Sequence, residues 1–125
     1  MINLKPIDEQ KKELAKIKRI IDLQFRGFRE GKFTSRRTYR SVVHAYVRYT
    51  ILHRGRMGIV VDIDDVQSYL RDLYAKGRTD SYINGVLSAL KYYSKKTYGK
   101  DSKILHQLER IRPTTMKEEK QNEKI

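Results

Sequence analysis

The chain has 125 residues, with 28 Lys and Arg against 15 Asp and Glu, and therefore a formal net charge of +13 at neutral pH. This length suits one compact domain with tails, and a 38% share of apolar residues can build a modest core, which argues against wholesale disorder. Cysteine is absent, which excludes disulfides, thiolate catalysis and cysteine-ligated metal. The longest apolar run, Ile59 to Val61, is too short to cross a bilayer, and the first residues lack a secretion signal. We therefore expect a soluble, cytoplasmic protein.

The positive charge is unevenly distributed along the chain. Residues 32–60 contain seven basic residues and no acidic one, residues 61–76 carry a net charge of −2, and residues 77–100 carry +4. A solvated surface normally mixes the two signs, whereas basic blocks of this length are typical of a face that meets a polyanion. Nucleic acid is the expected partner. The alternative is that the excess of Lys and Arg only keeps the protein soluble.

The first expected helix runs from Asp8, which can cap it, to about Glu30, and Gly31 can end it. Apolar residues recur along it every three or four positions, which is the spacing of one helix face. We expect this face to pack on its own domain, and packing on a neighbouring subunit is the alternative. The face consists of Leu14, Ile17, Ile21, Phe25 and Phe28.

A second helix is expected to begin after Thr34 or Ser35 and to end near His53. It carries an apolar stripe, predicted to face inward, and a basic stripe on the opposite side, predicted to face outward. The inward stripe consists of Tyr39, Val42, Val43, Tyr46, Tyr49 and Thr50 or Leu52. The outward stripe consists of Arg37, Arg40 or Ser41, His44 and Arg48.

Three shorter helices are expected to follow, capped in turn by Asp62, by Thr79 or Ser81, and by Ser102, the last ending before Pro113. No alternation typical of a strand is present, so the predicted fold class is all-α. The predicted core residues of these helices are Val66, Tyr69, Leu70, Leu73, Ile83, Val86 or Leu87, Leu90, Tyr93, Ile104, Leu105, Leu108 and Ile111.

No constellation of residues suited to catalysis or metal binding is found. None of His44, His53 and His106 belongs to a spacing that completes a metal site, and the acidic run at 62–65 lacks the glycine and glutamate of a calcium loop. Nucleophile motifs and phosphate loops are also missing. We expect no catalytic residues, no metal and no cofactor.

The segment from Gly55 to Gly58 is similar to the Gly-x-x-Gly loop that clamps nucleic-acid backbone in KH domains. A KH domain also needs three strands around its helices, and only residues 59–61 could form one. This loop is therefore a secondary candidate for RNA binding.

The expected fourth helix presents a polar side with small and basic residues. Gly85 and Ser88 lie one turn apart on it, with Tyr82 before them and Lys91 and Lys95 after them. Small residues let a helix backbone approach phosphates or a groove closely, where Lys and Tyr can contact phosphate oxygens or bases. The alternative is a solvated face with a glycine that serves helix packing.

Three parts of this pattern resemble one protein family. They are Thr38, the pair Tyr69 and Leu70 after Asp65, and the run from Tyr82 to Tyr93 with its Leu-Ser-Ala-Leu-Lys stretch. Together they resemble the N-terminal core-binding (SAM-like) domain of tyrosine recombinases, the phage integrase family, over residues 33–112. Val42 departs from the family, which often has an aromatic residue four positions after the Thr.

The resemblance implies a SAM-like four-helix orthogonal bundle, here with an additional N-terminal helix over residues 1–31. Residues 32–113 would be the core-binding domain and residues 114–125 a linker or tail. In such proteins this domain and a separate catalytic domain clamp the recombination core site on duplex DNA. The family's catalytic residues belong to that other domain, in the same or another chain, so this chain is expected to be non-catalytic.

In the family, the helices matching residues 35–53 and 80–96 lie against DNA, which agrees with the charge distribution. The predicted DNA-binding residues are Ser35, Arg36, Arg37, Arg40, His44, Arg48, Arg78, Thr79, Tyr82, Ser88, Lys91 and Lys95. Self-association on DNA is a further expectation. The rival hypothesis is a DNA- or RNA-binding regulator without a role in recombination, which would use the same basic helices or the loop from Gly55 to Gly58.

Overall fold

The computed structural model describes residues 7–28 and 33–112, with side chains from residue 37 onward in the second helix. These residues form helices and connecting turns without any strand, which confirms the all-α fold class. The chain divides into two compact units, residues 1–61 and 62–125. The helices are α1 (Ile7–Gly27), α2 (Phe33–His53), α3 (Ile63–Ala75), α4 (Asp80–Tyr98) and α5 (Lys103–Glu109).

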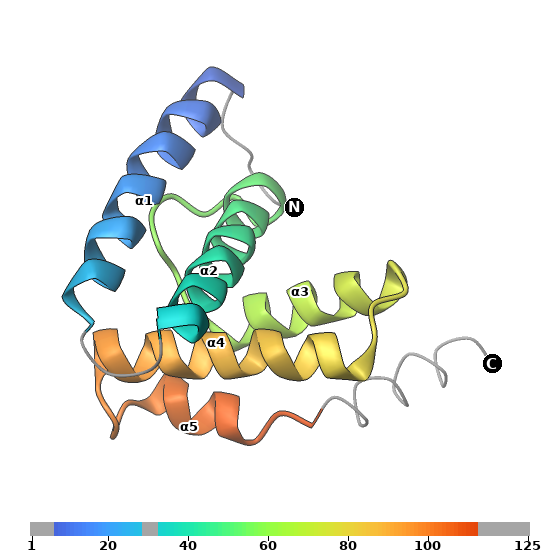
Figure 1. Ribbon diagram of the computed structural model, residues 1–125. Coiled ribbons are helices and arrows are strands. Elements are labelled where there is room, and N and C mark those ends of the chain that lie inside the picture. Colours follow the sequence, from blue (N-terminus) through green and yellow to red (C-terminus); the bar gives the residue numbers. More distant parts are fainter. Residues whose placement is uncertain (1–6, 29–32, 113–125) are drawn as a thin grey trace. The chain divides into compact units, whose positions relative to one another are not determined.

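In the first unit, α1 lies alongside α2 (Figure 1). Ile17, Ile21 and Phe25 of α1 are buried, while Leu14 and Phe28 at the two ends of the same face are half-buried. The apolar face predicted for this helix is confirmed, and it packs on α2 of its own chain.

The buried side of α2 differs from the prediction. Val43, Tyr46 and Thr50 are buried as expected, but Val47 and Ile51 are buried as well. Tyr39, Val42 and Tyr49, predicted to face inward, remain partly exposed. The physical reason is that Val47 and Ile51 lie on the helix face that includes His44, and α1 covers that face. The prediction treated this face as solvent-exposed because a sequence pattern cannot show which neighbour covers a mixed face.

Several predicted helix ends also need correction. α1 begins at Ile7 and ends at Gly27, so Asp8 lies in its first turn, and α2 begins at Phe33, before Thr34 and Ser35. Helix ends are weakly specified by single side chains, so differences of a few residues arise readily. α5 stops at Glu109, where i→i−3 hydrogen bonds tighten the chain into a turn. Residues 29–32 and 113–125, with the predicted stop at Gly31 and the predicted tail, lie outside the described part.

The loop after α2 contains two glycines with positive φ, +66° at Gly55 and +92° at Gly58. The hydroxyl of buried Tyr46 donates a 3.1 Å hydrogen bond to the carbonyl of Val60, which ties the end of this loop to the middle of α2. Residues 59–61 form no strand, so the loop lacks the sheet that a KH domain requires.

In the second unit, Asp62 caps α3 as predicted, because its carboxylate accepts a 3.1 Å hydrogen bond from the N–H of Asp64. α3 ends in a Schellman motif, in which the N–H of Gly77 bonds the carbonyl of Tyr74 and the N–H of Arg78 bonds that of Leu73. Gly77 occupies the left-handed position, with φ +84°. The motif reverses the chain within a few residues and delivers it directly to the start of α4.

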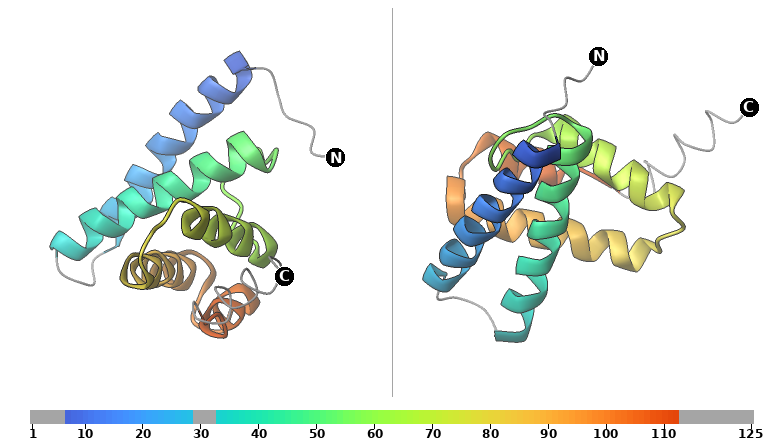
Figure 2. Two further views of the ribbon diagram at one scale, coloured as in Figure 1. Left: turned by 90° about the vertical axis from the view of Figure 1, so that its right-hand side faces the viewer. Right: turned by 90° about the horizontal axis from the view of Figure 1, so that it is seen from above.

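The core of the second unit gathers on one side of α4. α5 packs beside α4 and also contacts α3 (Figures 1 and 2). Every predicted core residue of α3 and α4 is buried, and Asp65, Ala89 and Ser94 join them. In α5, Leu105 and Leu108 are buried as predicted, whereas Ile104 is only half-buried. The buried residues are Asp65, Val66, Tyr69, Leu70, Leu73, Ile83, Val86, Leu87, Ala89, Leu90, Tyr93, Ser94, Leu105, Leu108 and Ile111.

Candidate nucleic-acid interface

The side of α4 opposite the core forms an exposed polar face, which we call the α4 face. Its residues recur at the three-and-four spacing of a helix, so they share one side over almost four turns. Lys91 is half-exposed and the others are exposed. The α4 face consists of Ser81, Asn84, Gly85, Ser88, Lys91 and Lys95.

The first turn of α4 adds an ordered group of residues to one end of this face. Thr79 is the cap, and its hydroxyl accepts a 3.1 Å hydrogen bond from the N–H of Tyr82. The guanidinium of Arg78 lies over the ring of Tyr82, 4.8 Å from its centroid, and Tyr82 is 40% exposed. The stacked pair places a cation and an aromatic edge next to the α4 face.

The electrostatics of this region are strongly one-sided. No acidic residue occurs between Ser81 and Lys100. Asp80, which precedes Ser81, accepts a 3.2 Å hydrogen bond from the hydroxyl of Tyr74, and burial together with this carboxylate raises the pKa of Tyr74 to about 12. The α4 face therefore presents lysines without carboxylates interspersed among them.

Gly85 has no packing role among the described residues. A Cβ atom added to it would meet no heavy atom within 4 Å. Glycine in a helix interior costs about 1 kcal/mol relative to alanine, and nothing in the described fold compensates for that cost. This excludes the alternative of a helix-packing glycine as far as residues 7–28 and 33–112 are concerned, and it leaves open space over the helix backbone.

The predicted basic stripe of α2 is divided by the packing of α1. Arg37 and Arg48 are exposed. Arg40 and His44 instead face Asp22 of α1, with Oδ1 of Asp22 3.7 Å from Nε of Arg40 and 3.2 Å from Nε2 of His44. Burial lowers the pKa of His44, and the carboxylate of Asp22 only partly opposes this effect. Arg40 and His44 therefore serve the α1–α2 interface, and Arg37 and Arg48 are the basic residues of this stripe that stay open.

Two predicted DNA-binding residues, Ser35 and Arg36, have side chains outside the described part of the chain. Sequence reasoning did not select Ser81 and Asn84 as binding residues, although they lie on the α4 face with Ser88. The regular spacing of the series 81, 84, 88, 91 and 95 would have identified both.

No family model, no curated protein and no solved structure matches the chain at a significant level. Within residues 7–28 and 33–112, no three His, Asp or Glu side chains are grouped as a metal would require. None of the helices in the described part is both long and apolar enough to cross a membrane.

Proposed function

We propose that this chain is a duplex-DNA-binding module that grips DNA with the α4 face and the adjoining Arg78 and Tyr82. The observation that carries the proposal is the open backbone at Gly85 in the middle of a face that has lysines and no acid. An isolated basic residue could serve solubility. A glycine whose cost in helix stability nothing offsets, on the same helix face as two serines and two lysines, is better explained by a partner that approaches the helix closely.

A duplex suits this face because an α-helix fits into the major groove, whereas the deep, narrow major groove of A-form RNA does not admit side chains. Lys91 and Lys95 would bind phosphates and set the register, and Ser88 and Asn84 have the size and polarity to reach base edges. The N–H groups of the first turn of α4 could assist at a phosphate, next to Arg78.

The cellular context we propose is site-specific recombination in the cytoplasm. The support for this step is the resemblance of residues 33–112 to core-binding domains of tyrosine recombinases. The chain would clamp one side of a core site, and a catalytic domain in the same or another chain would clamp the other. Strand exchange itself would reside in that domain.

A second candidate function uses the loop after α2. Gly55 and Gly58 both have positive φ, and Met57 between them is 43% exposed, so the loop projects a flexible apolar side chain beside Arg56. Such a loop could hold a single-stranded backbone, as expected of an RNA-binding regulator.

Fluorescence anisotropy would test the proposal with labelled duplex DNA and matched single-stranded RNA over a salt series. The samples are wild type, Lys91→Glu on the α4 face, and Lys103→Glu, an exposed position of α5 that changes net charge equally. If Arg78, Lys91 and Lys95 each contact one phosphate, affinity for duplex DNA should fall about 40-fold between about 50 and 200 mM salt. Lys91→Glu should weaken binding and reduce the slope of log K against log salt by about 0.9, the value for one phosphate contact.

Lys103→Glu should leave both the affinity and the slope near wild type. Equal losses for the two variants would mean that only net charge matters and would contradict the α4 face as the binding site. Preference for single-stranded RNA, with indifference to Lys91, would favour the loop from Gly55 to Gly58.

A further inference from the structure

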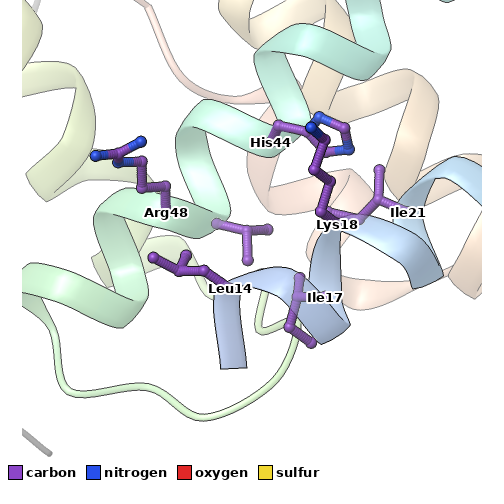
Figure 3. A pocket seen from close by; sticks show the side chains of 7 residues that line it. Leu14, Ile17, Lys18, Ile21, His44 and Arg48 are labelled. Atoms are coloured by element: carbon purple, nitrogen blue, oxygen red, sulfur yellow. The ribbon is translucent and has the colours of Figure 1, made fainter. Parts of the chain in front are cut away.

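A groove between α1 and α2 has an apolar floor and a cationic mouth (Figure 3). Ile17, Ile21 and Val47 are buried in the floor, and Leu14, which also lines the groove, is half-buried. The volume of the groove is about 250 Å³. Small-molecule sites usually measure about 300 to 1,000 Å³, so a single aliphatic side chain suits this groove better than a cofactor or metabolite.

The charges at the mouth of the groove favour an occupant that carries negative charge next to its aliphatic side chain. Lys18 and Arg48, both exposed, line it from α1 and α2, and no acidic residue lines it. Neither cation has an ion-pair partner among the described residues, and Asp22 of α1 is paired with Arg40 and His44 instead. The complementary occupant is an aliphatic side chain followed at once by carboxylates.

The chain itself displays such a group at the start of α1. Ile7 is 69% exposed, the most exposed large apolar side chain of the described part, and the exposed residues Asp8 and Glu9 follow it. The other strongly exposed apolar residue of α1, Leu23, adjoins Asp22, whose carboxylate is already engaged. Ile7 therefore matches the groove in both shape and charge.

Ile7 cannot enter the groove of its own chain. It lies two helical turns from Leu14 on the same helix, and a helix rises 1.5 Å per residue, so the two stay about 10 Å apart. We propose that Ile7 of one copy enters the α1–α2 groove of a second copy, where Asp8 and Glu9 approach Lys18 and Arg48. This contact joins two different surfaces, so it is heterologous and can propagate to a ring or a row of copies.

Cysteine cross-linking of the full chain tests this contact cleanly because the chain has no cysteine of its own. Ile7→Cys is mixed with isotopically labelled Leu14→Cys under mild oxidation, and mixed dimers are quantified by mass. Leu23→Cys is the control, since Leu23 is more exposed than Leu14 and lies on the outer side of α1. We expect at least tenfold more mixed dimer with Leu14→Cys than with Leu23→Cys.

Charge reversal provides the second measurement. Lys18→Glu with Arg48→Glu in the groove copy should abolish the mixed dimer, and so should Asp8→Lys with Glu9→Lys in the inserting copy. Combining the two reversed copies should restore it, because the charges are then complementary again. Circular dichroism checks that each variant stays helical. Equal cross-linking at Leu14 and Leu23, or yields that ignore charge reversal, would overturn the contact without affecting the proposed DNA binding.

Discussion

Oδ1 of Asp22 in α1 lies 3.2 Å from Nε2 of His44 in α2. Arg40 approaches the same carboxylate at 3.7 Å, so one acidic residue of α1 engages two basic residues that the sequence pattern assigned to DNA. Asp22 directly follows buried Ile21 in the sequence, and Ile21 belongs to the apolar contact between the helices. The polar and apolar contacts thus act together to hold α1 on α2.

Burial of His44 at this contact predicts that the stability of the first unit depends on pH. Burial lowers the pKa of His44 below its ordinary value of 6.5, so the folded state favours the neutral imidazole. As pH falls below about 7, the unfolded chain takes up a proton before the folded chain does, and the free energy of unfolding decreases. The loss is complete once pH lies below the folded-state pKa of His44.

Urea unfolding of wild type and His44→Gln between pH 8 and pH 5 checks this prediction. The wild type should lose stability across that window, and the variant should lose less. His106 is an exposed matched control, so His106→Gln should retain the wild-type dependence. Parallel pH profiles for wild type and His44→Gln would contradict the assignment.

The packing of α1 predicts a large difference between two neighbouring positions. Ile21 is 1% exposed and Leu23 is 58% exposed, on the same helix. Ile21→Ala removes a buried side chain from the α1–α2 contact and should cost about 2 to 5 kcal/mol, whereas Leu23→Ala should cost less than about 0.5 kcal/mol. Chemical denaturation of both variants measures the difference. Similar values for the two would show that α1 does not pack on α2 in solution.

The predictability of each helix from sequence depends on how many neighbours it has. In α4 the apolar and polar residues fall on opposite sides, so the pattern alone identified Ile83, Leu90 and Tyr93 as core and Ser88 and Lys95 as exposed. The cap Asp62 was also identified, and Thr79 was one of two alternatives with Ser81, because a side-chain oxygen before an apolar run is a local signal.

In α2 the pattern was insufficient because two sides of the helix are buried. Val47 and Ile51 share a face with His44, and periodicity alone cannot reveal that another helix covers a face of mixed polarity. The partnership of Asp22 with His44 depends on the register between α1 and α2. That register is a tertiary property, so only the folded chain reveals it.

The Schellman motif at the end of α3 predicts that Gly77 positions the binding residues that follow it. Its φ of +84° is unfavourable for a residue with a Cβ, so Gly77→Ala should cost about 1 kcal/mol of stability. It should also weaken DNA binding, because the turn places Arg78 and the cap Thr79 at the start of α4. Gly27→Ala, at the last residue of α1 without positive φ, serves as the control and should not destabilise the chain. Destabilisation of equal size by both substitutions would contradict the role of the motif.

Gly85 yields the prediction that separates folding from binding most clearly. Its missing side chain faces open space, so Gly85→Ala should stabilise α4 by about 0.5 to 1 kcal/mol through helix propensity alone. Gly85→Gln should fold equally well, since glutamine is also a good helix former. If DNA lies over the helix backbone at this position, the longer side chain must occupy the space of a phosphate or base and should lower duplex affinity at least tenfold. Ser68→Gln is the control for added bulk within the same unit, because Ser68 is a half-exposed position of α3 and the substitution is also polar. A Gly85→Gln protein that is stable and binds DNA like the wild type would place the DNA elsewhere on the molecule.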